Sequence, residues 1–142
     1  MKKDILLVNN MSLIIIIGLC GSGKSYYARS LDCKIYDDFI SSFYNGNLLY
    51  DLKYGNNVCA IDPRLCKKDT FDKYITIFQK YTNNISLVLF ENDSETCNKN
   101  VIERNDGRQG IIETNNYLTL QYNLDNYKNF VYSIKCCYHS DQ

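Results

Sequence analysis

The segment that most constrains the fold is an apolar run followed by a glycine-rich turn near the amino end of the chain. Residues 13–17 read LIIII, and residues 18–25 read GLCGSGKS. A continuous β-branched run is typical of a parallel strand that is buried on both faces. The turn satisfies the pattern G-x-x-x-x-G-K-[ST], and a helical pattern follows it. This strand–turn–helix unit predicts an α/β fold, with the turn at the carboxyl edge of a parallel sheet.

Each residue type in the turn suits contact with phosphate groups. Glycines at 18, 21 and 23 permit positive φ, so that backbone N–H groups can face phosphate oxygens. The Lys24 ammonium would reach the β- and γ-phosphates, and the Ser25 hydroxyl would ligate Mg²⁺. A turn that merely joins a strand to a helix is the alternative. We therefore expect ATP to bind at Gly18, Cys20, Gly21, Ser22, Gly23, Lys24, Ser25 and Tyr26.

Apolar runs and helical patterns alternate along the rest of the chain. Further strands are predicted at residues 33–36, 58–61, 85–90 and 130–137. Helices are predicted at residues 24–31, at 38–52 with an interruption near 45–47, at 71–78 with Asp69 or Thr70 as cap, at 93–104, and more weakly at 111–122. Because crossovers are right-handed, this alternation predicts one α/β domain over residues 1–142, with helices on both faces of a mainly parallel five-stranded sheet of order 2-3-1-4-5.

Composition and charge exclude several classes of protein. Of the 142 residues, 45% are hydrophobic and 23% are charged, which is ordinary for a globular domain. Sixteen basic residues balance sixteen acidic ones, so no overall positive field attracts nucleic acid. No apolar run approaches the roughly 20 residues of a membrane span. Seven cysteines, mostly in apolar runs, favour reduced thiols in a cytoplasmic, reducing compartment over disulfides or a zinc site.

Three segments resemble the small P-loop kinases, the group that contains polynucleotide kinase and the nucleoside and nicotinamide-riboside kinases. They are the turn at residues 18–25, the string YDDF at residues 36–39, and residues 90–108. The resemblance implies a P-loop NTPase three-layer sandwich that transfers the γ-phosphoryl group of ATP, with Mg²⁺, to a nucleotide-like acceptor. In such kinases an Asp after the second strand takes the proton from the attacking hydroxyl, and Asp37 and Asp38 match that place.

The position of Asp37 and Asp38 supports this role on physical grounds as well. A carboxylate at the carboxyl edge of the sheet, facing a γ-phosphate, can orient and deprotonate an alcohol. One of the pair should cap the next helix, and a cap usually lies directly before its helix, so we expect Asp38 to cap and Asp37 to be the base. Polynucleotide kinases carry an Arg where this chain has Ile40, which disfavours a nucleic-acid 5′-hydroxyl as acceptor.

Other carboxylates at predicted strand ends are candidates for the metal shell. Asp62 follows the run at 58–61, a pattern typical of the carboxylate that holds Mg²⁺ through water, although an Asp-Pro turn explains it equally. Glu91 and Asp93 would help around the metal, unless Asp93 is a helix cap. Arg64, at the same sheet edge as Asp62, would either meet an acceptor phosphate or carboxylate or be solvated.

Residues 90–108 resemble the strand, helix and lid of small phage-type kinases. Lid arginines in these kinases clamp the triphosphate and neutralise charge during transfer, which the resemblance implies for Arg104 and Arg108. Gly107 and Gly110 would be hinges of a closing loop. A basic turn that faces solvent is the alternative.

The sequence leaves three functions open. The first is an ATP-dependent kinase that acts on a hydroxyl or phosphate of a small nucleotide-like acceptor. The second is a non-catalytic nucleotide-binding module or a slow ATPase. The third is a polynucleotide 5′-hydroxyl kinase, disfavoured by the neutral net charge and by Ile40. Segments 39–56 and 64–70 would form the acceptor pocket, and no membrane partner is expected.

Overall fold

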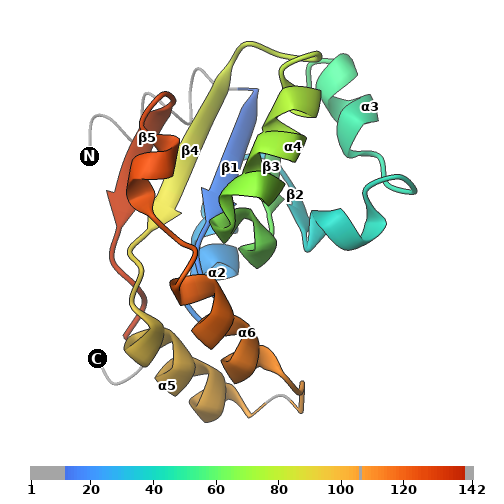
Figure 1. Cartoon of the computed structure of the whole chain (residues 1–142). Coiled ribbons are helices and arrows are strands. Elements are labelled where there is room, and N and C mark those ends of the chain that lie inside the picture. Colours follow the sequence, from blue (N-terminus) through green and yellow to red (C-terminus); the bar gives the residue numbers. More distant parts are fainter. Residues whose placement is uncertain (1–11, 106, 140–142) are drawn as a thin grey trace.

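The sheet is the frame of the molecule. The computed structural model describes residues 12–105 and 107–139. Five strands form one all-parallel sheet in the order β2-β3-β1-β4-β5, which confirms the predicted topology (Figure 1). Their bounds are β1 Leu13–Ile17, β2 Lys34–Asp37, β3 Val58–Ile61, β4 Ile85–Phe90 and β5 Val131–Lys135. The strand that precedes the glycine-rich turn is therefore central, so the turn lies in the middle of the carboxyl edge.

Helices follow the strands in the expected alternation. The α-helices are α2 Lys24–Ala28, α3 Leu48–Lys53, α4 Lys68–Phe78, α5 Ser94–Arg104 and α6 Ile111–Thr119. Three short 3-10 turns are η1 Phe39–Ser42, η2 Pro63–Cys66 and η3 Leu124–Tyr127. Helices α5 and α6 lie side by side beyond the carboxyl ends of the strands (Figure 1). Within the described ranges, no helix is long and apolar enough to cross a membrane.

Burial of β1 on both faces explains its continuous apolar sequence. All five of its residues are buried, and successive side chains point to opposite faces of the sheet. Leu13, Ile15 and Ile17 join the core packed beneath α3 and α4. Ile14 and Ile16 join a smaller core with Ala28 of α2. The sheet is therefore covered by helices on both faces.

Several predicted element ends are corrected. Helix α2 ends at Ala28 rather than at residue 31, and the predicted helix over 38–52 is split into η1 and α3. Neither Asp69 nor Thr70 caps α4, because the helix begins at Lys68 and Asp69 lies inside its first turn. In the first turn, an acidic side chain still interacts favourably with the positive end of the helix dipole. Strand β5 ends at Lys135, and the chain then leaves the sheet toward residues 18–25. There the Tyr138 N–H donates to the Ser22 carbonyl at 2.9 Å.

The cysteines are thiols, as expected from their apolar surroundings. All seven lie within the described residues and none forms a disulfide. Cys59, Cys66, Cys97 and Cys137 are buried, whereas Cys136 is exposed. Burial raises the pKa of the Cys66 thiol to about 12. The buried thiols thus behave as small apolar side chains.

Candidate functional site

The glycine-rich loop, residues 18–25, needs glycine for two separate reasons. Gly21 and Gly23 have φ of 89° and 103°, in the left-handed region that favours glycine. A Cβ at Gly21 would also lie 2.4 Å from the Cys97 carbonyl oxygen of α5. The loop backbone is therefore both tightly curved and pressed against α5.

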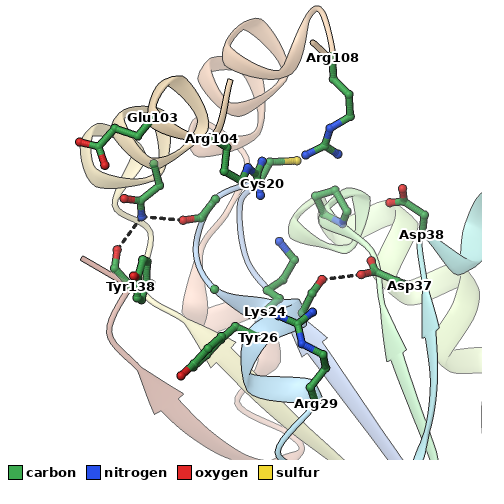
Figure 2. A pocket seen from close by; sticks show the side chains of 15 residues that line it. Cys20, Lys24, Tyr26, Arg29, Asp37, Asp38, Glu103, Arg104, Arg108 and Tyr138 are labelled. Atoms are coloured by element: carbon green, nitrogen blue, oxygen red, sulfur yellow. Dashed lines mark hydrogen bonds between the residues drawn. The ribbon is translucent and has the colours of Figure 1, made fainter. Parts of the chain in front are cut away.

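A cavity of about 690 Å³ opens at this loop and collects most of the predicted site residues (Figure 2). The predicted residues that line it are Cys20, Gly21, Gly23, Lys24, Ser25, Tyr26, Asp37, Asp38, Arg104 and Arg108. Gly18, Ser22 and Asp62 are not among the lining residues. The cavity thus joins the glycine-rich loop to the end of β2 and to the connection between α5 and α6.

The lining of the cavity includes a cation, a hydroxyl and a carboxylate that lie close together in the fold. Lys24 is buried, and its ammonium donates to the Leu19 carbonyl at 2.7 Å. The Ser25 hydroxyl donates to the Asp37 carboxylate. Asp37 ends β2, so this bond links the start of α2 to the carboxyl end of β2. An ammonium and loop N–H groups suit phosphate oxygens, and the hydroxyl and carboxylate oxygens suit Mg²⁺.

Asp38 does not cap the following turn, contrary to expectation. It holds the N-cap position of η1 but makes no side-chain cap bond, and its backbone is left-handed with φ of 51°. The Ile40 N–H instead donates to the Asp62 carboxylate at 3.2 Å. Both Asp37 and Asp38 therefore face the cavity, and capping no longer distinguishes them as candidate bases.

The Asp62 carboxylate forms a salt bridge with Arg64. The fully buried carboxylate of Asp62 accepts from Nε and Nη2 of Arg64, each at 2.8 Å, and from the Arg64 backbone N–H at 3.0 Å. These hydrogen bonds raise the pKa of Arg64. Arg64 Nη2 also donates to Ser41 Oγ at 2.9 Å. This network holds η1 against the end of β3. The role of Asp62 as a metal ligand stays a prediction.

Glu91 and Asp93 lie outside the cavity lining. The Asp93 carboxylate accepts from the Thr96 N–H at 3.1 Å and caps α5, as one of the two sequence interpretations stated. Hydrogen bonds from Thr96 lower the pKa of Asp93. Glu91 accepts from the Cys136 thiol at 3.2 Å.

Two buried asparagines that the sequence interpretation missed hold the glycine-rich loop. Asn115 of α6 is fully buried, accepts from the Cys20 N–H at 2.9 Å and donates to the Cys20 carbonyl at 2.8 Å. Asn100 of α5 donates to the Gly21 carbonyl at 2.9 Å and to the Tyr138 carbonyl at 2.6 Å. The sequence does contain a signal for Asn115, because this residue lies four positions after Ile111 on the apolar stripe of its helix. A side-chain amide buried on such a stripe needs hydrogen-bond partners.

Arg29 and Tyr138 also line the cavity, although sequence patterns did not indicate them. Tyr26 and Tyr138 line it with ring centroids 6.2 Å apart, and the Arg29 guanidinium lies 5.9 Å from the Tyr26 ring centroid. Arg104 and Arg108 lie across the loop from Arg29 (Figure 2). The surroundings of the loop are thus rich in cations.

The two glycines between α5 and α6 both have a left-handed backbone, and their role as hinges stays a prediction. Gly107 and Gly110 have φ of 82° and 77°. A Cβ built at either position would meet no atom within 4 Å. Both glycines therefore serve backbone conformation rather than close packing.

Comparison with known proteins shows similarity to an uncharacterized viral protein. No protein-family model matches the chain. The chain is 45% identical over 130 residues to the uncharacterized protein R277 of Acanthamoeba polyphaga mimivirus. The alignment covers 87% of this chain and 94% of that protein. The similarity therefore extends over most of both chains.

Proposed function

The chain belongs to the same family as the uncharacterized mimivirus protein R277, and we propose that it is a P-loop kinase that transfers the γ-phosphoryl group of ATP. The observation that carries the proposal is the hydrogen bond from Ser25 to Asp37 beside Lys24. It places the last two residues of a G-x-x-x-x-G-K-[ST] loop and a strand-end carboxylate in one cavity. A cavity of about 690 Å³ is also within the range of small-ligand sites.

The glycine-rich loop would hold the triphosphate through its backbone and Lys24. The first N–H groups of α2 have no acceptor one turn earlier in the helix, so they suit phosphate oxygens. The Lys24 ammonium would exchange the Leu19 carbonyl for phosphate oxygens. Arg104 and Arg108 line the same cavity and would neutralise charge at the transferring group.

Ser25, the last residue of the glycine-rich loop, fits a magnesium site by its hydroxyl oxygen, which lines the cavity. Mg²⁺ bound there would neutralise charge on the β- and γ-phosphates. A contribution from Asp62 would require its release from Arg64. The proposal therefore assigns Ser25 to the metal and keeps Asp37 as the base.

Asp37 would act as general base during transfer. The acceptor hydroxyl oxygen forms a bond to the γ-phosphorus, and the bond from that phosphorus to the β–γ bridging oxygen breaks. The electron pair of the broken bond leaves with ADP. The hydroxyl proton would pass to the Asp37 carboxylate, which accepts from the Ser25 hydroxyl and would therefore lie near the bound γ-phosphate. Asp38 follows it at the same end.

The test is transfer of labelled phosphate from γ-labelled ATP by the Asp37→Asn variant, scored over a panel of acceptors. The amide retains an oxygen for the Ser25 hydroxyl, so we expect the fold and the ATP affinity to persist. Transfer should fall by about 10²–10⁴-fold because the base is lost.

Asp38→Asn is the matched control for Asp37→Asn. Loss of transfer only in Asp38→Asn would move the base to Asp38 and keep the kinase. A wild-type chain that binds ATP without transferring phosphate to any acceptor would instead favour a nucleotide-binding module or slow ATPase. Unchanged turnover in both variants would contradict the carboxylate-base mechanism.

A further inference from the structure

We propose that Cys97 and Cys137 are a site of reversible oxidation, which a peroxide converts to a disulfide that displaces the glycine-rich loop. Cys97 lies on α5, and Cys137 lies in the irregular segment that follows β5. The reaction modifies the chain itself, so its chemistry is separate from the proposed phosphoryl transfer.

The two sulfur atoms already lie close together, although 40 positions separate them in the sequence. Cys97 Sγ and Cys137 Sγ are 3.5 Å apart, and both side chains are buried. A disulfide bond is about 2.05 Å long, so the sulfurs must approach each other by about 1.5 Å. Because Cys97 is held within a helix, most of this movement would fall on the segment that carries Cys137.

Hydrogen bonds favour Cys137 over its neighbour as the thiol that reacts. The Cys137 thiol donates to the Glu91 carbonyl at 3.3 Å, which leaves the Cys97 thiol as the donor between the two sulfurs. This hydrogen bond from Cys97 lowers the pKa of Cys137, whereas burial opposes it. Cys136 is exposed, but its contact with the Glu91 carboxylate raises its pKa. Since the thiolate is the form that peroxide oxidises, Cys137 is the better nucleophile of the two neighbours.

A peroxide would reach Cys137 through local opening of residues 136–139. In this segment the Tyr138 N–H donates to the Ser22 carbonyl at 2.9 Å, and the Tyr138 carbonyl accepts from Asn100 at 2.6 Å. Irregular segments open at a lower free-energy cost than packed helices and strands. Cys97 is fully buried on α5, so it would serve as the second thiol, which resolves the oxidised Cys137.

The proposed oxidation has two steps. The Cys137 sulfur attacks one oxygen of hydrogen peroxide, the O–O bond breaks, and Cys137 becomes a sulfenic acid while the other oxygen leaves as water with the thiol proton. The Cys97 sulfur then attacks the Cys137 sulfur. The S–S bond forms, the S–O bond breaks, and the hydroxyl group leaves as water with the Cys97 proton. Two thiols and one peroxide thus give one disulfide and two waters, and the two electrons lost by the sulfurs reduce the peroxide.

The disulfide would act on the glycine-rich loop because both partners adjoin it. The Cys97 carbonyl oxygen would lie 2.4 Å from a Cβ at Gly21, so α5 and the loop are in close contact. Tyr138, which directly follows Cys137 and lines the cavity, holds the Ser22 carbonyl (Figure 2). A displacement of about 1 Å would break a hydrogen bond of this length unless the loop moved with it. Oxidation should therefore disturb the curvature of the loop and weaken its hold on phosphate groups.

The test treats the full chain with hydrogen peroxide and maps disulfides by mass spectrometry of unreduced proteolytic peptides. We expect a crosslink between Cys97 and Cys137 that dithiothreitol reverses. In the oxidised chain, the amides of residues 18–25 should exchange with deuterium at least about threefold faster. The affinity for a non-hydrolysable ATP analogue with Mg²⁺ should fall by about tenfold, since roughly one hydrogen bond of the loop is lost, and should return on reduction.

Variants assign the effect to one pair of thiols. Cys97→Ala and Cys137→Ala each remove one partner and should abolish the crosslink and the change in exchange. Cys33→Ala is the matched control, because Cys33 belongs to a second thiol contact, with Cys59, and both effects should persist in it. Cys136→Ala should retain both effects as well. Each variant is compared with its own reduced form, so that a change in stability is not mistaken for a redox effect.

The outcomes separate the thiol pair from the kinase. Absence of the crosslink in the peroxide-treated wild type, or a crosslink through Cys136 instead, would overturn the assignment of the pair. A crosslink between Cys97 and Cys137 with unchanged exchange at residues 18–25 would contradict its action on the loop. If the reduced chain fails to bind the ATP analogue, the kinase proposal is lost, and the crosslink and the deuterium exchange still decide whether the thiol pair acts on the loop.

Discussion

Asp51 shows how single polar contacts fix the surroundings of the site. Its carboxylate, on α3, is buried and accepts from the Tyr36 hydroxyl, from Lys34 Nζ at 3.1 Å and from Asn56 Nδ2 at 3.0 Å. Tyr36 directly precedes Asp37 on β2. The hydrogen bond from Tyr36, followed by that from Lys34, lowers the pKa of Asp51. This cluster therefore holds α3 beside the strand that carries the proposed base.

The lowered pKa of Asp51 predicts a pH dependence of stability. A carboxylate whose folded-state pKa is below its ordinary 3.8 stabilises the fold above that value, and the contribution is lost as pH falls through the folded-state pKa. Asp51→Asn should therefore reduce the free energy of unfolding in urea at about pH 7, and the gap to the wild type should narrow by about pH 3. Asp72→Asn, which affects an exposed pair with Lys68, is the control. An equal gap at both pH values would count against this account.

At the scale of elements, α5 and α6 brace the glycine-rich loop. Asn115 binds both polar groups of the Cys20 backbone, and Asn100 joins the loop to the segment after β5. The same two helices end and begin at the connection that carries Arg108. A movement of the segment between α5 and α6 would therefore displace the glycine-rich loop as well.

The brace predicts a specific loss in Asn115→Leu. The half-buried Cys20 N–H and carbonyl would lose their partners, which costs roughly 1–3 kcal/mol of stability. A loosened loop should also bind an ATP analogue about tenfold or more weakly at a temperature where the variant is fully folded. Asn116→Ala, at the adjacent exposed position, is the control. Loss of stability with unchanged affinity would show that Asn115 supports α6 alone.

At the scale of the whole molecule, much of the fold could be predicted because local patterns determine it. The buried run of β1 and the β-branched strands alternate with amphipathic helices, and right-handed crossovers then leave few sheet orders. The bounds of β1, β3 and β4 agree with the apolar runs that predicted them. The meeting of Ser25 with Asp37 at one sheet edge follows from the same topology.

What could not be predicted depends on tertiary contacts. The Asp62 carboxylate, which Arg64 holds in place, also accepts from the Ile40 N–H. Asp38 therefore does not cap the 3-10 turn η1 with its side chain. Neither the left-handed backbone of Asp38 nor the partner of Asn115 has a local signature. Each position is set by a residue distant in sequence, which periodicity does not detect.

The most direct test of the central claim is calorimetric titration of a non-hydrolysable ATP analogue, with Mg²⁺, into the wild-type chain and into Lys24→Ala. We expect the wild type to bind one equivalent and Lys24→Ala to bind weakly or not at all, because the ammonium is the buried cation of the glycine-rich loop. Circular dichroism should show both chains folded. Equal affinity in the two folded chains, or no binding by the wild type, would contradict the assignment of the loop as a triphosphate site.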